Sequence, residues 1–267
     1  MNIDRTLLAR YFRQLADLGI TEISLDAMTA DQALDLLAGR SRAAAEARTP
    51  QRLTDAASGE PGAVLSANVV APLHDTSDAP ESARRLQVLA EQAASCTQCR
   101  LHADRSTVVF GEGSADADLV VVGEAPGQEE DRSGRPFVGR AGKLLDLMLA
   151  SVGFPRSTVY ICNVLKCRPP NNRNPLPDEI EPCTTNFLHG QIDAIKPRVL
   201  LAVGTFAARA LLASEESIGS LRGRVHSYRG TPLVATYHPA YLLRSPQMTR
   251  AAWQDYQLVR RVLDEQA

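Results

Sequence analysis

The sequence predicts a three-layer α/β/α protein, in which a four-stranded parallel sheet lies between two layers of helices. Two observations support this fold class. Segments with helical spacing of apolar residues alternate with short apolar runs that are typical of strands buried on both faces. This alternation indicates parallel strands joined by right-handed crossovers, which bring all the carboxyl ends to one edge of the sheet. The predicted strands are 119–122, 159–164, 199–203 and 232–236, and the predicted helices are about 141–151, 178–195 and 205–213.

Three regions follow one another along the chain. Residues 1–40 have helix-period leucines and alanines and predict a small helical extension, which either docks a protein partner or has no separate role. Residues 41–83 are rich in Ala, Ser, Pro, Asp and Gly, a composition that buries too little apolar surface to fold, and they predict a flexible linker. Residues 84–267 form the predicted main domain, whose first helix leads into a pair of cysteines.

Composition narrows the function only slightly. The chain has 267 residues, of which 44% are hydrophobic and 22% charged, as in globular proteins. No run is long and apolar enough for a membrane helix, and the first residues lack the apolar block of a secretory signal, so we expect a cytoplasmic monomer without a membrane partner. A net charge of −2 neither supports nor excludes DNA binding through a local basic groove.

The stretch from Gly123 to Gly142, GEAPGQEEDRSGRPFVGRAG, follows the first predicted strand. It places the carboxylate of Glu124 and several backbone N–H groups at the carboxyl edge, where open α/β sheets bind ligands. Gly123 and Gly127 allow a close approach that side chains would block. The alternative is an ordinary turn between a strand and a helix.

Three further side chains are candidates for the same edge. Asn163 ends the second predicted strand and offers both a donor and an acceptor to a planar ligand, or else it caps a turn. His238 follows the fourth strand, before a proline. Phe137 lies in the GRPFVG loop, where it either stacks on a flat ligand or fills the core. No phosphate-binding loop, dinucleotide fingerprint or nucleophile elbow is present.

Five cysteines in a chain without a secretory signal indicate metal or redox chemistry rather than disulfides. Four of them form two pairs, one spaced C-x2-C and the other C-x15-C, which suit zinc or an iron–sulfur cluster equally. Cys162 lies inside an apolar strand and is expected to be a buried hydrophobic residue. The four candidate ligands are Cys96, Cys99, Cys167 and Cys183.

Together, the glycine-rich stretch, NVLKCRPPNNR, HPAYLL and the order of the four cysteines resemble the family 4 uracil-DNA glycosylases, over roughly residues 86–263. The resemblance implies an enzyme that flips uracil out of DNA and hydrolyses its N-glycosidic bond, leaving an abasic site. It also implies a 4Fe-4S cluster on the four paired cysteines, with a structural role.

The resemblance assigns a role to each site residue. It implies that Phe137 stacks on the uracil and that Asn163 pairs with its O4 and N3–H edge. His238 donates to O2, and Glu124 stabilises the positive charge on the sugar. Further contacts are implied for uracil and the adjacent phosphate (Gly123, Ala125, Gly127 and Gln128) and for DNA (Arg173, Leu242, Leu243 and Arg244). Either leucine would fill the gap left by the flipped base.

Three alternatives remain at this point. Family 1 enzymes read GQDPYH where this chain reads GEAPGQ, so the water-activating Asp is replaced by Ala125, and Glu124 or Gln128 would have to position water. Relatives that become covalently attached to DNA carry a basic, His-bearing insertion, but this chain has only the short NNRNPLP there. A non-catalytic DNA-damage or redox-sensing module is the third alternative.

Overall fold

The computed structural model describes residues 80–266. The helical extension predicted for residues 1–40 and nearly all of the linker predicted for 41–83 lie outside this part of the chain. The helix expected before the first cysteine pair is present as α3, which begins at Glu81. Within residues 80–266, no helix is both long enough and apolar enough to cross a membrane.

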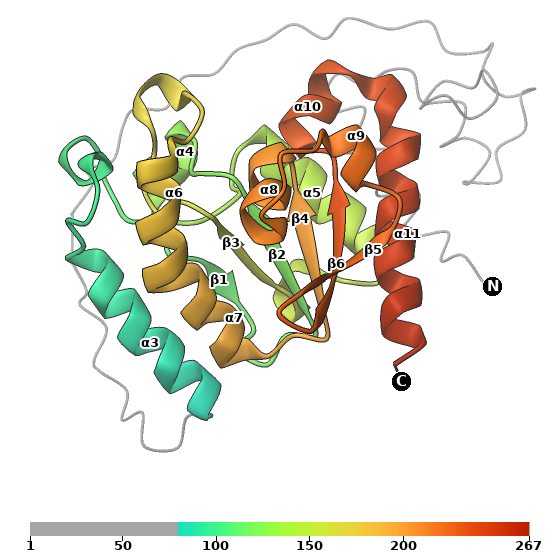
Figure 1. Ribbon diagram of the computed structural model, residues 1–267, viewed down its shortest axis with the longest axis horizontal. Helices are drawn as coiled ribbons and strands as arrows, with labels where there is room; N and C mark the ends of the chain where they lie inside the picture. The colour runs from blue at the N-terminus through green and yellow to red at the C-terminus, as the bar shows by residue number, and fades with distance from the viewer. Residues whose placement is uncertain (1–79, 267) are drawn as a thin grey trace, which may run out of the picture.

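A mixed sheet in the order β1-β3-β2-β4-β6-β5 forms the centre of the described fold (Figure 1). Its four inner strands run parallel, as the sequence predicts, and each edge strand runs antiparallel to its neighbour. The prediction of four strands missed both edges, because β1 has only two residues and β5 has no continuous apolar run. The strands are β1 Glu112–Gly113, β2 Leu119–Gly123, β3 Tyr160–Asn163, β4 Val199–Val203, β5 Val225–Tyr228 and β6 Thr231–Thr236.

The predicted helices are present, and the helices at Gln128–Ser133, Ile218–Leu221, Pro239–Arg244 and Thr249–Asp264 are additional to the prediction. The segment predicted as a single helix at 178–195 is interrupted by a π-helical turn, η6, directly after a cysteine. The helices are α3 Glu81–Ala94, α4 Gln128–Ser133, α5 Arg140–Ser151, α6 Pro177–Cys183, η6 Thr184–Leu188, α7 His189–Ile195, α8 Thr205–Leu212, α9 Ile218–Leu221, α10 Pro239–Arg244 and α11 Thr249–Asp264. Short 3-10 turns are η3 Arg100–Ala103, η4 Arg156–Thr158, η5 Pro170–Asn172 and η7 Pro246–Met248.

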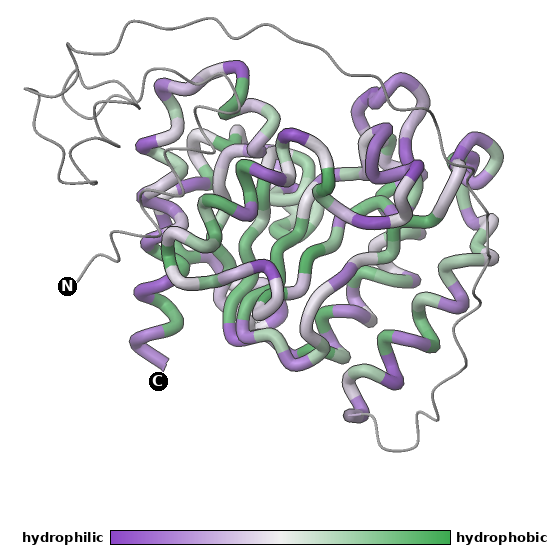
Figure 2. Tube along the Cα trace, turned by 180° about the vertical axis from the view of Figure 1, so that it is seen from behind, coloured by the Kyte–Doolittle hydropathy of each residue, from purple (hydrophilic) through white to green (hydrophobic). Residues whose placement is uncertain are grey.

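Two hydrophobic cores lie on opposite faces of the sheet. Along β2, Val120 and Val122 belong to one core, whereas Leu119 and Val121 belong to the other, because successive strand residues point to opposite faces. The first core includes residues of α3, α7 and α8, and the second includes residues of α5, α10 and α11. Figure 2 shows the hydrophobic residues concentrated along the central strands. These cores fix the positions of the strand ends that carry the site.

Candidate active site and cysteine centre

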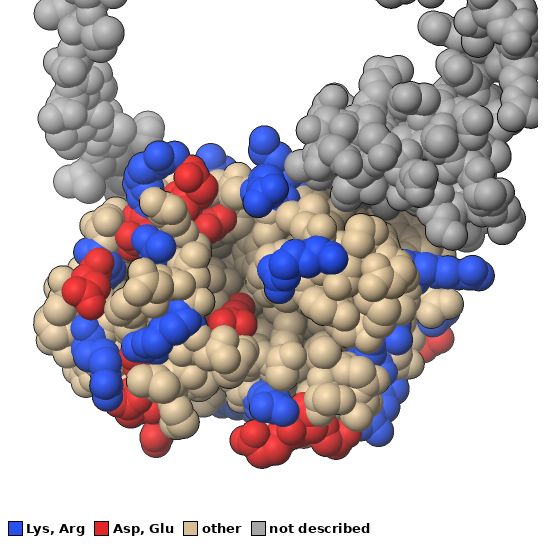
Figure 3. All heavy atoms as spheres, turned by 90° about the horizontal axis from the view of Figure 1, so that it is seen from above, with Lys and Arg blue, Asp and Glu red and all other residues tan. Residues whose placement is uncertain are grey.

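The carboxyl ends of the parallel strands bring the candidate site residues together. Gly123 at the end of β2 pairs in register with Asn163 at the end of β3. His238 follows two residues after β6 and is the N-cap of α10. The face seen from above in Figure 3 has a hollowed centre that is mostly uncharged, with an acidic group inside and Lys and Arg side chains around it. This is the edge that the sequence predicts as the site.

Phe137 lies in this edge with an unusual backbone. Its φ of 52° is in the left-handed region, which costs a non-glycine residue on the order of 1 kcal/mol. The ring is buried and lies 5.7 Å from the His238 ring, measured between centroids. It also lies against Gly123, where an added Cβ would come within 2.5 Å of the ring. The aromatic face and the imidazole therefore border one small space.

Asn163 has an unsatisfied acceptor in the same space. The side chain is only 1% exposed, and its Oδ1 accepts no hydrogen bond from any described residue. A buried polar atom without a partner typically costs about 1–3 kcal/mol, so such atoms are rare unless a ligand satisfies them. Here β3 aligns Asn163 directly with Gly123, whose lack of a side chain leaves room at Oδ1.

The hydrogen bonding of His238 fixes its tautomer. Its Nδ1 accepts a hydrogen bond from the backbone N–H of Ala240 at 3.1 Å. In the neutral ring the proton is therefore on Nε2. Burial, and then the charge of Arg244, lower the pKa of His238 to about 4, against a smaller opposing effect of Glu130. At neutral pH the ring is an uncharged hydrogen-bond donor through Nε2.

Glu124 follows β2 directly, and no described residue donates a hydrogen bond or forms an ion pair with its carboxylate. Its backbone oxygen accepts from the N–H of Leu165, which holds the loop against the strand next to it. Burial raises the pKa of Glu124 to about 7. A carboxyl group with a raised pKa and no protein partner is typical of a functional site.

The backbone of the glycine-rich loop is held by a residue that the sequence analysis did not single out. Glu130 accepts hydrogen bonds from the N–H groups of Gly127 at 3.2 Å, Val138 at 2.9 Å and Gly139 at 3.0 Å. The N–H of Gly127 is therefore already engaged, whereas Ala125 is half-buried and Gln128 is exposed at the start of α4. The sequence signal for Glu130 was its position in the first turn of a helix, three residues after a glycine N-cap.

The structure changes two of the predicted DNA contacts. Leu242 is 1% exposed and packs in the core with α5 and α11, so it is not available as a wedge. Both terminal nitrogens of Arg173 donate to the buried carboxylate of Glu179, so this guanidinium is committed to an internal ion pair. Leu243 is only partly buried, and Arg244 is exposed on the same helix.

Substituting Gly123 with alanine should weaken substrate binding. The added Cβ would lie 2.3 Å from Asn163 Oδ1 and 2.5 Å from the Phe137 ring, so both groups would have to move. We expect KM for the substrate of this site to rise about tenfold or more, the size of a lost hydrogen bond. Gly219→Ala, where the added Cβ meets its nearest atom at 3.7 Å, is the control. An unchanged KM for Gly123→Ala would contradict this geometry.

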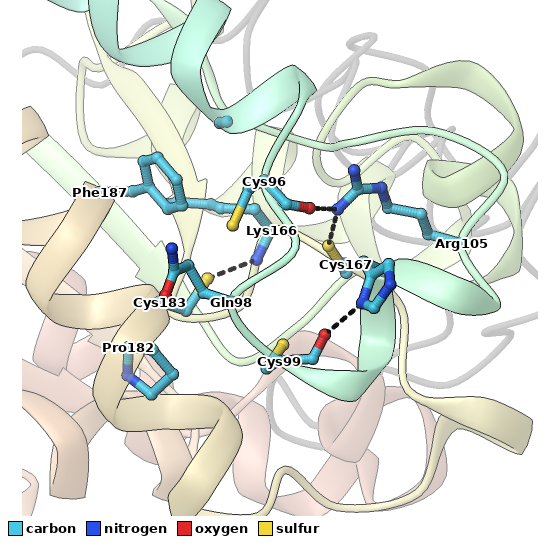
Figure 4. A pocket seen from close by; sticks show the side chains of 11 residues that line it. Cys96, Gln98, Cys99, Arg105, Lys166, Cys167, Pro182, Cys183 and Phe187 are labelled. Atoms are coloured by element: carbon cyan, nitrogen blue, oxygen red, sulfur yellow. Dashed lines mark hydrogen bonds between the residues drawn. The ribbon is translucent and has the colours of Figure 1, made fainter.

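The four predicted ligand cysteines line one pocket, together with Arg105 and Lys166 (Figure 4). Arg105 donates to the sulfur of Cys167 and the backbone N–H of Lys166 donates to that of Cys183, both at 3.3 Å. Burial raises the pKa of Cys183 to about 11, and the charge of Lys166 opposes this rise. Within residues 80–266, no three Cys, His, Asp or Glu side chains are close enough to hold a single metal ion. The four thiols thus line one shared space.

Cys162 is separate from this set, as the sequence predicts. It is fully buried in β3 and packs in the core with α7 and α8.

A buried lysine connects the cysteine pocket with the candidate active site. Lys166 is 1% exposed, and its Nζ donates to the backbone oxygen of Asn163 at 2.7 Å and to Oε1 of Gln191 at 2.5 Å. The amide nitrogen of Gln191 in turn donates to the Tyr160 hydroxyl and to the Phe110 carbonyl. The sequence analysis did not identify Lys166, although it directly precedes a predicted ligand.

Sequence comparisons with known proteins identify the family. A model of the Uracil DNA glycosylase superfamily matches residues 110–257. The chain is 47% identical over 162 residues to the type-4 uracil-DNA glycosylase of Thermotoga maritima, which covers 60% of this chain and 84% of the relative. It is 42% identical over 182 residues to the type-4 enzyme of Archaeoglobus fulgidus, covering 65% and 91%. A type-5 uracil-DNA glycosylase of Pyrobaculum aerophilum is 33% identical over 147 residues, covering 49% and 64%.

This α/β fold, with its polar groups at the carboxyl edge, therefore belongs to the Uracil DNA glycosylase superfamily. The type-4 relatives match at higher identity and over more of their length than the type-5 relative does. Within the superfamily the chain is a type-4 uracil-DNA glycosylase, an N-glycosylase hydrolase of base excision repair, which confirms the predicted family.

Proposed function

We propose that this enzyme removes uracil from DNA by recognising the flipped base at Asn163, with Phe137, His238 and Glu124 in the roles described below. The observation that carries this proposal is the unsatisfied Oδ1 of Asn163, which is buried beside an aromatic ring and a neutral imidazole. Uracil supplies what this space lacks, because its N3–H donates to an acceptor and its flat ring can stack. The target base must leave the helix to reach this space.

Asn163 gives selectivity against cytosine. Oδ1 accepts from N3–H of uracil while the side-chain amide donates to O4. Cytosine presents an acceptor at N3 and a donor at N4, so both pairings would be reversed. A site that leaves buried polar groups unpaired with the wrong base discriminates by large factors.

Bond cleavage moves negative charge to the base and positive charge to the sugar. When the bond between C1′ and N1 breaks, its electron pair stays with uracil and charge builds up on O2. The Nε2–H of His238 is oriented to donate there, since Nδ1 is held by Ala240. The ionised carboxylate of Glu124 stabilises the oxocarbenium charge on the sugar. Water then adds to C1′, and the proton that it releases balances the charge of the departing uracil anion; either Glu124 or Gln128 positions this water.

The contacts with DNA beyond the base come from α10. Leu243 is the wedge that enters the gap left by uracil, since Leu242 is in the core. Arg244 is exposed one residue further on and contacts a phosphate. Single-stranded and double-stranded DNA can both carry a uracil and a neighbouring phosphate. The proposed partner is therefore uracil-containing DNA of either kind.

Cys96, Cys99, Cys167 and Cys183 hold a 4Fe-4S cluster in this proposal. The pocket fits such a group for two reasons. Four thiols line one shared space, and two N–H groups donate to the sulfurs, as is common at iron–sulfur sites. An iron–sulfur centre is also characteristic of the type-4 family. The cluster supplies cross-links between α3, the loop after β3 and α6, and no reacting group.

Replacing Cys183 with serine should therefore release iron and destabilise the fold. We expect the visible absorption and the iron content to fall, and the melting temperature to drop by several degrees, because a cross-link between distant segments is lost. Cys162→Ala is the matched control, since this buried thiol lies outside the pocket. A Cys183→Ser protein with full iron content and unchanged melting would contradict the assigned ligand set.

The activity is tested with the full chain, after its iron content has been measured. A labelled single-stranded oligonucleotide with one uracil is incubated with the protein and then cleaved at abasic sites by hot alkali. We expect a break at uracil and none in a matched oligonucleotide with thymine or cytosine, and His238→Leu should form the break far more slowly than the wild type. Iron-loaded protein that binds the oligonucleotide but yields no break would support a non-catalytic module, and a DNA–protein band on a denaturing gel would support covalent capture. Either result would contradict hydrolysis.

A further inference from the structure

Arg156 makes an unusually complete set of hydrogen bonds below the candidate active site. It lies in η4, between α5 and β3, in a segment that no motif covers. Its Nε and Nη2 donate to Oε1 of Glu112 at 2.8 and 2.6 Å, and its Nη1 donates to Oδ1 of Asp146 at 2.8 Å. The guanidinium is only 23% exposed, so these two carboxylates hold it in one orientation.

The remaining donors of Arg156 reach the backbone of the stacking loop. Nη2 donates to the carbonyl of Pro136 at 2.6 Å and Nη1 donates to the carbonyl of Phe137 at 3.3 Å. A planar guanidinium with several fixed donors can bind two neighbouring carbonyls at once, whereas an ammonium acts as a point charge.

The loop needs such support because its backbone is strained. Phe137 has a φ of 52°, a conformation that persists in a non-glycine residue only when its surroundings enforce it. On the other side of the loop, Glu130 accepts from the N–H groups of Val138 and Gly139. The carbonyls of Pro136 and Phe137 are thus held by the positively charged Arg156. The N–H groups of the next two residues are held by the negatively charged Glu130.

We propose that Arg156 is a positioning residue for uracil recognition, because it holds the Pro136–Phe137 backbone so that the Phe137 ring is in its stacking position before DNA arrives. This inference rests on the proposed function of Phe137. No described contact joins Arg156 to Asn163, Glu124 or His238, so it acts through the stacking ring alone. Binding of the flipped base should therefore depend on Arg156 far more than bond cleavage does, since preorganisation reduces the cost of ordering a site.

The test compares Arg156→Gln with Arg135→Gln. Arg135 also pairs with Glu112, with Nε at 2.7 Å from Oε2, but it contacts no carbonyl of the loop. We expect Arg156→Gln to raise KM for a uracil-containing oligonucleotide about tenfold and to change kcat by less than about threefold. Arg156→Lys should recover part of the loss, and Arg135→Gln should resemble the wild type. Free uracil as a competitive inhibitor should show the same order of affinities.

A double substitution separates positioning from general stability. In a Phe137→Ala background, Arg156→Gln should add little to KM, because the ring that it positions is gone. If Arg156→Gln raises KM by its full factor in that background, or if it lowers only the melting temperature, the inference is wrong. Should Arg156→Gln fail to fold, Asp146→Asn removes one carboxylate that orients Arg156 and should raise KM in the same direction; an unchanged KM would contradict the inference. A wild-type protein that releases no uracil would instead overturn the proposed function.

Discussion

Replacing His238 with leucine should lower kcat for uracil release by about 10²- to 10³-fold, the usual loss when one preorganised donor is removed from a developing oxyanion. The imidazole is neutral and carries its proton on Nε2, so it can donate a hydrogen bond without first taking a proton from solvent. Single-turnover release from a labelled oligonucleotide measures the effect. His226→Gln is the control, because His226 lies on the edge strand β5 and contacts a backbone carbonyl there. A loss of less than about fivefold in His238→Leu would remove this residue from the mechanism.

The same ring makes stability depend on pH. Its pKa is about 4 in the folded protein and near 6.5 in the unfolded chain, so the unfolded state binds the proton more tightly. The stability that comes from the neutral ring is therefore complete above about pH 6.5 and is lost as the pH falls towards 4. Melting temperatures of the wild type and His238→Leu should converge over that interval. A constant difference between pH 7 and pH 4.5 would contradict the depressed pKa.

Replacing Glu124 with glutamine should lower kcat/KM about 100-fold and remove a pH dependence. Burial raises the pKa of Glu124 to about 7, so the anion that stabilises the sugar forms only as the pH rises through that value. We expect kcat/KM of the wild type to increase between about pH 6 and pH 8, and that of Glu124→Gln to stay flat. Initial rates over this range, with an alkali-cleavage assay, measure both. An increase that persists in Glu124→Gln would assign it to another group.

The partly buried carboxyl group of Glu124 also makes the stability of the fold depend on pH. This dependence has the opposite sign to that of a salt-bridged carboxylate. Because the folded pKa is raised above the ordinary 4.5, ionisation is easier in the unfolded chain. Stability is lost as the pH rises from about 4.5 to 7, and Glu124→Gln should melt at a higher temperature than the wild type at pH 8 but not at pH 4.5. Such a trade of stability for reactivity is common at active sites.

The parallel strands at the centre of this fold were predictable because the local pattern of apolar residues determines where they lie in the sequence. Strands buried on both faces have continuous apolar runs, and β4 was predicted with its bounds unchanged. The edge strands were missed because they are short or partly exposed, so their sequences lack such a run. Helix α11 was not predicted, although it has apolar residues at helical spacing along its length.

The site was predictable only in part, for physical reasons. Asn163 ends β3 and His238 comes two residues after β6, so topology alone brings them to one edge. In contrast, the sequence YLL does not indicate which of its two leucines faces the core. The packing of α10 against α5 shows that it is Leu242. Arg156 and Glu130 bind backbone groups of the loop around Phe137, and these contacts depend on how the loop folds, which the sequence pattern does not show.

Lys166 lines the cysteine pocket and is hydrogen-bonded to the end of β3, so it would link the proposed cluster to the fold. Its ammonium is enclosed among neutral acceptors, the Asn163 carbonyl and the Gln191 amide oxygen, and in the described part of the chain no carboxylate pairs with it. A buried cation without a counter-charge is costly. In the cluster proposed above, the deprotonated thiols would supply that counter-charge, and the chain would then be most stable with the cluster in place. Iron limitation would in that case reduce the amount of folded protein as well as its metal content.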